Sequence, residues 1–285
     1  MTKILDGKKV GESIRNHAAS EAKALREKGI IPKLAILRVG EEESSISYEA
    51  SAVKVMKECG IETEQITLNE KVDSEAVLQK IRSLNEEKTV HGIILMHPLP
   101  SHLAKSKISE AINPLKDVDG LHPINLGRLV EGDLNGLTPS TPQAVIEILK
   151  YYETELEGAD VVVIGSSSTV GKPLSIMLTN LKATVSNLHI YSKNLEKYTK
   201  NADILISATG HLGLVSNNHI KEGSVIIDVG YGYKEGKPMG DVNFSDVYPK
   251  VSAITPVPGG VGAVTTSVLA SQVIKAAKAL NIVDE

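Results

Sequence analysis

Three segments of this sequence combine residue types that bind nucleotides or small polar ligands. The stretch Thr255–Thr266, TPVPGGVGAVTT, is rich in proline and glycine, which cannot continue a helix or a central strand. It follows an apolar run and precedes a helical one, which is where an α/β enzyme places a ligand loop. A tight structural turn is the alternative interpretation of Pro-Gly-Gly alone. The other two segments are KDVDGLHPINLGRL (Lys116–Leu129) and VVVIGSSSTVGKPLS (Val161–Ser175).

The third of these segments has the order strand, small-residue loop, helix, which is a phosphate-binding pattern. Small residues let the backbone approach a pyrophosphate, and the N–H groups at the start of the helix point at it. The pattern differs from G-x-G-x-x-G, because Ser167 takes the place of the second glycine and the last glycine comes one residue late. A plain strand–helix turn is equally compatible with it. The candidate cofactor-binding residues here are Gly165, Ser166, Ser167, Val170 and Gly171.

Composition and charge argue against several classes of protein. At 285 residues the chain suits two modest domains or one large one, and 41% hydrophobic content is typical of a globular protein. A net charge of −4 without a basic block gives no support for nucleic-acid binding. The sequence has no signal-peptide core and no apolar run of about 20 residues, so we expect neither export nor a membrane span.

The single cysteine and the histidines give no indication of a metal site. Cys59 cannot form an internal disulfide, suits a reducing compartment, and is expected to be a small buried residue. The histidines show no paired metal-ligand spacing. We therefore predict a cytoplasmic protein without a bound metal.

Apolar runs and helical patterns alternate along the chain, which predicts an α/β fold with two mostly parallel sheets. The boundary between two domains is expected near Asn135–Thr141, where Gly, Pro and Ser cluster. The expected strands are Pro32–Val39, Ile61–Leu68, Val90–Leu95, Val161–Ile164, Val185–Ile190, Ile204–Ala208 and Val225–Val229. The expected helices are Gly11–Lys28, Ser44–Glu58, Ser74–Asn85 with Ser74 as its N-cap, Thr141–Lys150, Lys172–Asn180 and Ser267–Leu280.

Taken together and in this order, the segments KDVDG, GSSSTVG and PGGVG resemble the methylenetetrahydrofolate dehydrogenase/cyclohydrolase family. The resemblance runs nearly from end to end of the chain. It implies an N-terminal α/β folate domain of residues 1–138 plus 263–285, a Rossmann-like dinucleotide-binding domain of residues 139–262, a site in the cleft between them, and a homodimer. It also implies oxidation of 5,10-methylenetetrahydrofolate to the 5,10-methenyl form, with NAD(P)+ as the hydride acceptor.

The resemblance also assigns the substrate-binding residues. In the family the tyrosine at the position of Tyr48 lies along the pterin, and the aspartate at the position of Asp119 holds the amino-pyrimidine edge. A carboxylate suits that edge because it accepts hydrogen bonds from adjacent N–H groups. A turn-forming Asp-Gly pair is the alternative interpretation of Asp119. The PGGVG loop supplies Pro258, Gly259, Gly260 and Val261.

Two positions depart from the family pattern. The family carries a cyclohydrolase lysine four residues after the tyrosine, and this position is Ala52 here; the glutamine that contacts the lysine corresponds to Met96. Lys54 lies roughly 120° round the helix from Tyr48 and is expected to be solvated. His97 is expected to point away from the position of the glutamine, because successive strand residues face opposite sides.

The sequence leaves the choice between NADP and NAD open, with NADP favoured. No acidic residue follows the strand Val185–Ile190 to hold a ribose 2′-hydroxyl, whereas Ser192 and Lys193 could hold a 2′-phosphate. Family members that use NADP often carry an arginine on this surface, where this chain offers Ser166 and Ile190. The remaining cofactor contacts implied by the resemblance are Ala208, Thr209, Gly210, Gly230 and Thr265.

The two reactions of the family make different demands on the protein. Hydride transfer from the methylene bridge needs aligned carbons and exclusion of water, but no protein base. Hydrolysis of the methenyl ring needs an activated water, and a positioned acid or base is worth about 10²–10⁴-fold. We therefore expect a dehydrogenase with weak or absent cyclohydrolase activity. The alternatives are a fully bifunctional enzyme that uses Lys54 or His97, and a catalytically silent folate- or nucleotide-binding protein.

Overall fold

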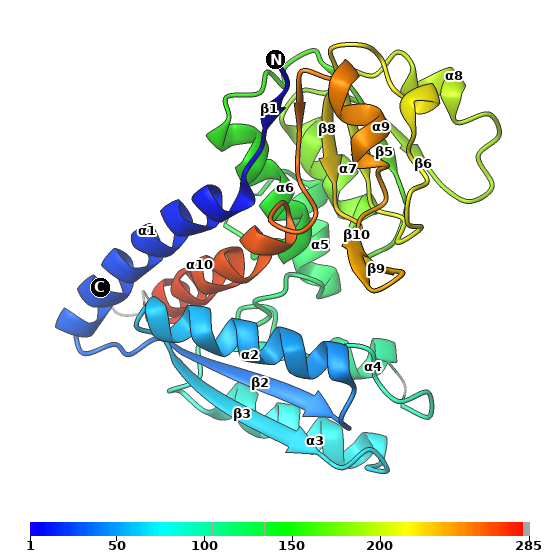
Figure 1. The fold of residues 1–285 in the computed structure, drawn as a ribbon. Helices are drawn as coiled ribbons and strands as arrows, with labels where there is room; N and C mark the ends of the chain where they lie inside the picture. The colour runs from blue at the N-terminus through cyan, green and yellow to red at the C-terminus, as the bar shows by residue number, and fades with distance from the viewer. Residues whose placement is uncertain (104, 134, 282–285) are drawn as a thin grey trace. The chain divides into compact units, whose positions relative to one another are not determined.

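The structure is a computed structural model that describes residues 1–103, 105–133 and 135–281 (Figure 1). The chain forms two compact units. Unit 1 comprises residues 1–11 and 141–265, and unit 2 comprises residues 12–140 and 266–285. Each unit has its own parallel sheet, as the alternation of strands and helices predicts. The last four residues of the folate domain expected from the sequence, 282–285, lie outside the described residues.

The N-terminus belongs to a different unit from the one that the sequence suggests. Strand β1 (Lys3–Ile4) pairs in parallel with β11 (Ala253–Ile254), and both are strands of the unit 1 sheet. The expected folate domain begins at residue 1, whereas unit 2 begins at residue 12. A two-residue strand has no periodicity of its own, so its partner is decided by contacts with residues some 250 positions away.

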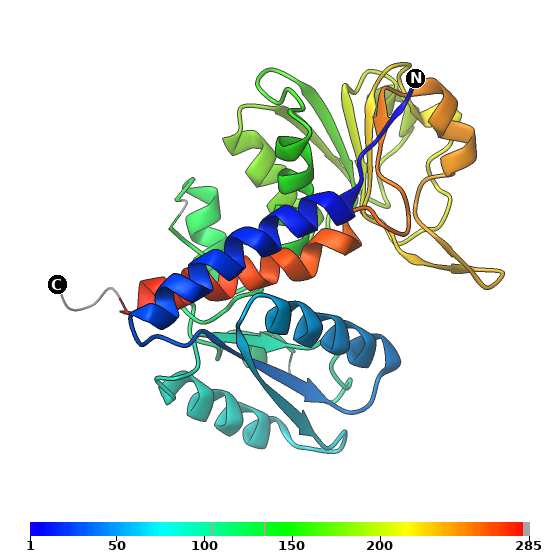
Figure 2. The ribbon, with the colours of Figure 1, turned by 60° about the vertical axis from the view of Figure 1, so that its left-hand side comes forward.

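Unit 2 contains a three-stranded sheet of the order β3-β2-β4, in which both pairings are parallel. Its strands are β2 (Lys33–Val39), β3 (Glu62–Leu68) and β4 (Gly92–Leu95). Helix α2 (Glu43–Glu58) covers one face of the sheet and α3 (Ser74–Glu86) the other (Figures 1 and 2). The N-cap of α3 is Asp73, whose carboxylate accepts a hydrogen bond from Ala76 N; the expected cap, Ser74, is the first helical residue.

The alternation of side chains along β2 and β4 produces two separate cores. Leu34, Ile36 and Ile94 pack with residues of α2 in one cluster. Their neighbours Ala35 and Leu37 pack with residues of α3 in the other. Successive strand residues face opposite sides of a sheet, so a strand covered on both faces must be apolar throughout. The first cluster also contains residues of α1 (Gly7–Glu27) and α10 (Gly262–Asn281), two helices that lie side by side in Figure 2.

Unit 1 contains a six-stranded parallel sheet of the order β1-β11-β8-β7-β5-β6. Its longer strands are β5 (Asp160–Ile164), β6 (Thr184–Leu188), β7 (Ile204–Ser207) and β8 (Val225–Asp228). These are the four strands expected from the sequence, each ending one or two residues earlier or starting one residue earlier than predicted. The helices of this part of the chain are α6 (Ser140–Tyr151), α7 (Gly171–Asn180), α8 (Glu196–Thr199) and α9 (Phe244–Val247).

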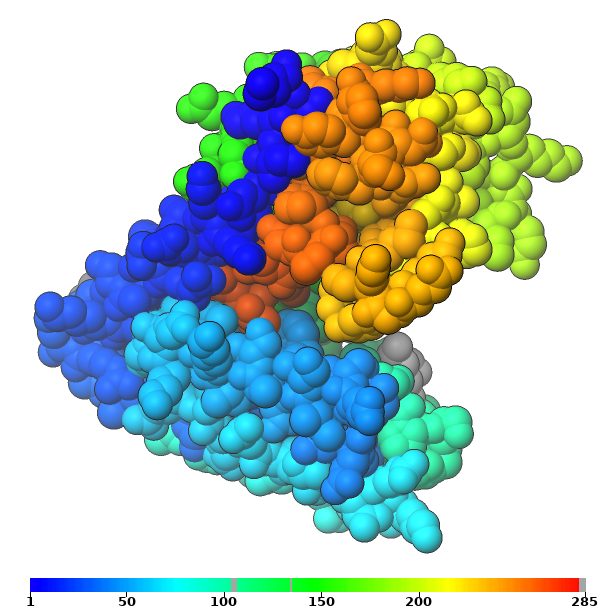
Figure 3. Space-filling model, in the orientation of Figure 1, coloured from blue at the N-terminus to red at the C-terminus, as the bar shows by residue number. Residues whose placement is uncertain are grey.

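Several short elements have no counterpart in the sequence-based expectation. A hairpin of β9 (Gly232–Lys234) and β10 (Lys237–Met239) follows β8 and lies on the surface of unit 1 shown in Figure 3. Unit 2 contains α4 (Lys105–Ser109) and α5 (Pro123–Val130). Two 3-10 turns, Asn217–His219 and Tyr248–Lys250, complete the regular structure of unit 1. No helix in the described part of the chain is long and apolar enough to cross a bilayer.

Candidate functional site

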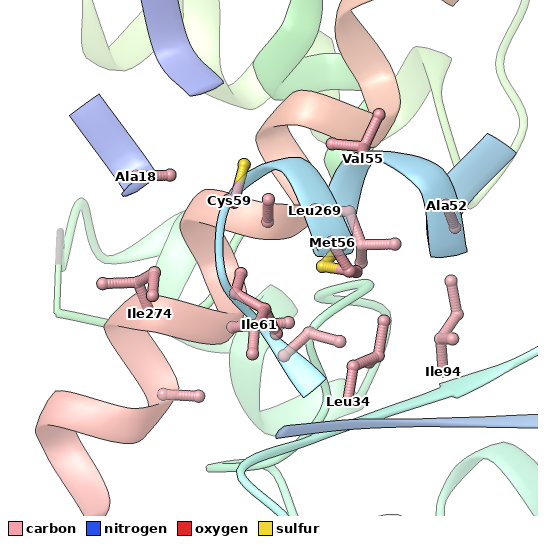
Figure 4. Close-up of a cluster of buried hydrophobic side chains, with 14 of the residues drawn as sticks. Ala18, Leu34, Ala52, Val55, Met56, Cys59, Ile61, Ile94, Leu269 and Ile274 are labelled. Carbon is pink, nitrogen blue, oxygen red and sulfur yellow. The ribbon is translucent and has the colours of Figure 1, made fainter. Parts of the chain in front are cut away.

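Tyr48, Ala52 and Met96 come together in unit 2, as expected for residues of one site. Tyr48 and Ala52 lie one turn apart on α2, and Met96 directly follows β4. Ala52 is 1% exposed and Met96 is 5% exposed, and both belong to the apolar cluster against which Tyr48 packs. Figure 4 shows Ala52 above Ile94 of β4. Ala52, where the resemblance implies a lysine, is therefore a buried methyl group in apolar surroundings.

Lys54 and His97, the two alternative proton donors, have different surroundings. Lys54 is exposed on α2, as its angular position relative to Tyr48 predicts. His97 follows Met96 and is not a member of the apolar cluster. Its carbonyl oxygen accepts a hydrogen bond of 3.0 Å from Ser45 Oγ, which ties the start of α2 to the segment after β4.

Two buried residues of the KDVDG segment, Lys116 and Asp117, anchor the backbone that leads to Asp119. Lys116 is buried, and its Nζ donates to the carbonyl oxygens of Leu84, Asn85 and Glu87 at the end of α3, at 3.0, 2.8 and 2.8 Å. Asp117 Oδ2 accepts from His122 N at 2.7 Å and from Asn125 Nδ2 at 3.1 Å, which connects the segment to α5.

The environment of Asp119 favours its protonated form. Burial, with a further contribution from the charge of Asp117, raises the pKa of Asp119 to about 7, although a hydrogen bond with Ser140 acts in the opposite direction. Burial also raises the pKa of Tyr48, and the charge of Asp119 adds to this effect, so the two side chains are electrostatic neighbours. The expected substrate-positioning pair is thus brought together in unit 2.

The Asp-Gly turn is also a structural feature in its own right. Gly120 has φ +67°, and a Cβ on it would lie 2.2 Å from the carbonyl carbon of Thr138. The turn is closed by the hydrogen bond from Gly120 N to Asp117 O, at 3.0 Å. Gly120 thus accounts for the conformation of the turn, and the turn does not depend on the side chain of Asp119.

In unit 1, the GSSSTVG loop connects β5 to α7. Gly165 has φ +114°, and a Cβ on Gly171 would lie 1.9 Å from Gly165 O. Gly171 is therefore required by the close approach of α7 to the end of β5, so a larger residue at this position disturbs the loop before any ligand binds. Ser167 Oγ accepts a hydrogen bond of 3.1 Å from Val170 N, the N-cap residue of α7.

The exposed part of this loop suits a phosphate group. Ser167, Ser168 and Thr169 are exposed, and they immediately precede the N-terminus of the ten-residue helix α7. A helix N-terminus carries unsatisfied N–H groups and a partial positive charge, both of which favour an anion. The loop therefore fits the pyrophosphate of a dinucleotide.

A negative charge on this loop is expected to weaken dinucleotide binding. Glutamate in Ser168→Glu would lie a few ångströms from the pyrophosphate, where like charges cost about 4 kcal/mol near a protein surface. We expect the dissociation constant to rise at least about tenfold. Calorimetric titration with NADP and NAD measures it. Ser168→Gln, which adds the same bulk without charge, is the matched control. Equal affinities of the Glu and Gln variants would contradict the placement of the phosphate.

The strand ends on either side of this loop carry the other expected cofactor residues. Ser192 Oγ accepts a hydrogen bond of 2.9 Å from His189 N, which closes a turn after β6, and Lys193 is exposed. Ile190 and Tyr191 are 91% and 85% exposed. After β7, the carbonyl oxygen of Ala208 approaches the phosphate loop: a Cβ on Gly165 would lie 2.3 Å from it. The segment Ala208–Gly210 therefore borders this loop. Residues 189–194, which directly follow β6 and are all described, contain no carboxylate, in line with the sequence.

The PGGVG loop lies in unit 1 and packs against the start of α1. Gly7 N donates to Gly259 O at 2.8 Å, and a Cβ on Gly7 would lie 2.0 Å from Gly260 O. Gly259 has φ +103°, which favours glycine. These contacts explain the glycines by backbone packing, in line with the structural turn that is the alternative interpretation of Pro-Gly-Gly. Val261 is 2% exposed, and its carbonyl accepts from Thr265 Oγ1 at 3.2 Å.

Sequence reasoning missed the buried polar groups that hold these loops. Lys116 and Asp117 were read only as part of a motif, and two buried aspartates of unit 1, Asp228 and Asp241, were not singled out. A usable signal exists for the latter pair: a buried strand ends in Asp228, and Asp241 lies between Gly240 and an apolar residue. A charged residue next to such apolar segments is informative, because its burial needs specific partners.

Comparisons with known proteins cover both units. Residues 5–119 match the family model of the tetrahydrofolate dehydrogenase/cyclohydrolase catalytic domain, and residues 139–281 match that of its NAD(P)-binding domain. The bifunctional protein FolD of Alkaliphilus metalliredigens is 46% identical over 282 residues, which is 99% of each chain.

Solved structures agree with these matches. The bifunctional FolD methylenetetrahydrofolate dehydrogenase/cyclohydrolase of Campylobacter jejuni is 43% identical, with a TM-score of 0.96 over 98% of this chain and 99% of the other. The Trypanosoma brucei enzyme, described as complexed with NADP and an inhibitor, is 33% identical, with a TM-score of 0.93 over 98% of each chain.

Proposed function

Since this chain belongs to the tetrahydrofolate dehydrogenase/cyclohydrolase family, we propose that it oxidises 5,10-methylenetetrahydrofolate to 5,10-methenyltetrahydrofolate and hydrolyses the product weakly or not at all. Unit 2 binds the folate and unit 1 binds the dinucleotide in this proposal. The loops that support the first reaction, GSSSTVG and PGGVG, are complete. The groups that would support the second are replaced by Ala52 and Met96.

The residues of unit 2 bind and orient the folate. The Asp119 carboxylate accepts hydrogen bonds from the N–H groups of the pterin edge, and the ring of Tyr48 lies along the pterin face. A bound nicotinamide dinucleotide supplies the hydride acceptor. On unit 1, the exposed residues Ser167–Thr169 at the N-terminus of α7 hold the pyrophosphate, and Gly171 allows the close packing that shapes this loop. The protein supplies no acid or base to the hydride transfer, because its tasks are alignment and exclusion of water.

The observation that carries the proposed loss of hydrolysis is the apolar environment of Ala52. Ala52 and Met96 are buried in one hydrophobic cluster, beside Tyr48. Neither can donate or accept a proton, and an isolated charge there would be expensive. The apolar side chains at these two positions support the proposal that neither of them activates a water molecule.

One observation favours a fully bifunctional enzyme as the second candidate. The relatives with the highest identity reported above are named as bifunctional proteins. In that case Lys54 or His97 would move the protons in place of the missing lysine. A catalytically silent binding protein is the third candidate, and the complete pair of loops argues against it.

NADP is the proposed cofactor, with NAD as the alternative. The family model describes an NAD(P)-binding domain, and one similar solved structure is described with NADP. In this chain, Ser192 and the exposed Lys193 lie after β6, where the 2′-phosphate of NADP would bind. Residues 189–194 contain no carboxylate that would repel this phosphate.

A single assay separates these candidates. Reduction of NADP and NAD is followed spectrophotometrically with 5,10-methylenetetrahydrofolate, and the methenyl product is followed at its own absorbance. We expect reduced dinucleotide and accumulating methenyltetrahydrofolate. Dinucleotide reduction without accumulation indicates the bifunctional enzyme, and no reduction with either dinucleotide indicates the silent protein.

A homodimer in the cytoplasm completes the proposal. The proposed dimer rests on the family resemblance. The proposed location rests on the single cysteine, Cys59. This residue is buried, as predicted, and burial raises the pKa of its thiol to about 11. We expect twice the 30.5 kDa chain mass in light scattering at micromolar concentration. A mass of one chain under these conditions contradicts the dimer.

A further inference from the structure

Two buried carboxylates, Asp228 and Asp241, lie at the carboxyl end of the unit 1 sheet and have no part in the function proposed so far. Asp228 is the last residue of β8, and it is in register with Ser207, the last residue of β7. Asp241 follows β10. Their exposed fractions are 3% and 0%. Two ionisable side chains buried this deeply need specific partners.

Asp228 joins the two ends of the β9–β10 hairpin. Its Oδ1 accepts hydrogen bonds from Gly230 N at 3.0 Å and from Asp241 N at 2.9 Å, and its Oδ2 accepts from Val242 N at 3.0 Å. The segments that enter and leave the hairpin are thus held by one carboxylate. This brings Asp241 to the end of β7.

Asp241 holds the end of β7 through one of its two oxygens. Oδ2 accepts from Ser207 Oγ at 2.9 Å, from Thr209 N at 2.7 Å and from Thr209 Oγ1 at 2.9 Å. Thr209 Oγ1 in turn accepts from His211 N at 3.0 Å. Thr209 donates its only hydroxyl proton to Asp241, so this hydrogen bond fixes the orientation of the Thr209 side chain.

The second oxygen of Asp241 is held without a hydrogen bond. Among the residues that the structure describes, Oδ1 is buried and has no hydrogen-bond partner. A Cβ on Gly230 would lie 2.1 Å from it, and a Cβ on Gly240 would lie 2.0 Å from Asp228 Oδ2. The glycines therefore make room for the two carboxylates.

We propose that Asp241, held by Asp228, is a positioning residue for the dinucleotide: it sets the strand-end segments Ala208–Gly210 and Val229–Gly230 against which the bound dinucleotide lies. The inference rests on the proposed function, because it presupposes a dinucleotide at this edge of the sheet. Asp241 is 0% exposed and acts through Ser207 and Thr209 rather than by touching the ligand, while Asp228 holds Gly230.

The first test removes the carboxylate and measures each ligand separately. Asp241→Ala is expected to raise the dissociation constant for NADP or NAD about 10- to 100-fold, because small misplacements of a binding group have effects of this size. The dissociation constant for tetrahydrofolate stays within twofold. Asp241→Asn, whose amide oxygen can take the place of Oδ2, recovers most of the affinity.

The matched control is Asp246→Ala. Asp246 is a partly buried aspartate of the same unit that accepts from Asn217 N at 2.8 Å and from Asn217 Nδ2 at 2.7 Å. It holds a loop away from the strand ends, so its loss leaves both dissociation constants unchanged. Equal effects of Asp241→Ala and Asp246→Ala would overturn the inference and indicate a general loss of stability.

A second measurement reads the position of the strand end directly. Amide hydrogen exchange at Thr209 is expected to accelerate in Asp241→Ala and to stay slow in Asp246→Ala. Thr209→Val, which removes only the hydroxyl, lowers dinucleotide affinity, whereas Thr209→Ser keeps it. Combined with Asp241→Ala, Thr209→Val adds little, because both remove the same interaction. Fully additive effects would overturn the inference even if Asp241→Ala folds poorly.

Dinucleotide binding by the natural protein separates failure of the positioning role of Asp241 from failure of the proposed function. If it binds a dinucleotide and Asp241→Ala binds it equally well while Thr209 exchanges faster, the positioning role is refuted and the proposed function stands. If the natural protein binds neither NADP nor NAD, the proposed function fails, and the inference fails with it.

Discussion

The double substitution Ala52→Lys with Met96→Gln is expected to give this protein a methenyltetrahydrofolate hydrolase activity about 10²–10⁴-fold above that of the natural chain. Ala52 lies one helical turn from Tyr48, and Ala52 and Met96 share one buried cluster. A lysine and a glutamine introduced there would contact each other. Burial lowers the pKa of a lysine, which brings its proton exchange closer to neutral pH.

The single substitutions and a displaced lysine provide the controls. Each change alone should restore less activity than the pair, because the two groups act as a contact pair. Ala50→Lys with Met96→Gln places the lysine on an exposed position of the same helix, so it should not restore hydrolysis. Hydrolysis is followed by the loss of methenyltetrahydrofolate absorbance, with the rate in buffer subtracted.

The natural protein tests the premise that hydrolysis of methenyltetrahydrofolate is weak or absent. We expect its hydrolysis of methenyltetrahydrofolate barely to exceed the rate in buffer. A rate comparable to its dehydrogenase turnover would show that another residue moves the protons. Lys54→Ala and His97→Ala would then identify which of the two it is.

Folate affinity is expected to depend on the ionisation of Asp119. A carboxylate that accepts hydrogen bonds from N–H groups binds best when ionised, and burial with the charge of Asp117 raises the pKa of Asp119 to about 7. Below this pKa a proton must leave before the folate binds. Affinity should therefore be nearly constant above pH 8 and fall about tenfold between pH 8 and pH 6.

Removing the charge of Asp119 should weaken folate binding and abolish its pH dependence. In Asp119→Ala we expect tetrahydrofolate to bind about 10- to 100-fold more weakly at pH 8, since a hydrogen bond to a charged group is worth about 1.5–3 kcal/mol. The pH profile should become flat, and the dinucleotide affinity should stay nearly constant. Calorimetric titration at pH 6, 7 and 8 under anaerobic conditions measures all three quantities.

Asp73→Asn is the control for this prediction. Asp73 is an aspartate of the same unit that caps α3, and asparagine is an equally good cap, so folding and binding should be unaffected. Equal loss of folate and dinucleotide affinity in Asp119→Ala would indicate that the residue matters only for the turn. The pKa shift itself predicts the opposite sign for stability: because the native pKa lies above that of the unfolded chain, the contribution of Asp119 to stability falls as the pH rises from about 4 to about 7.

The sequence by itself determined the alternation of elements and the identity of the loops. Leu34–Leu37 and Val161–Ile164 read as buried strands because a strand covered on both faces must be apolar at every position. The resemblance implies a lysine at the position of Ala52, four residues after Tyr48, and a glutamine at the position of Met96, and both stay predictions. The strand assignments succeed because they depend on local periodicity and on short motifs.

The tertiary structure decided how distant residues support those loops. The partner of β1 is β11, some 250 residues away, and no local pattern records such a pairing. The raised pKa of Asp119 depends on burial and on Asp117, and the role of Asp241 depends on strand ends that the sequence separates by about 30 residues. Even Gly171 is explained by Gly165 O rather than by a ligand. Burial and electrostatic interactions depend on proximity in space, which only the folded chain creates.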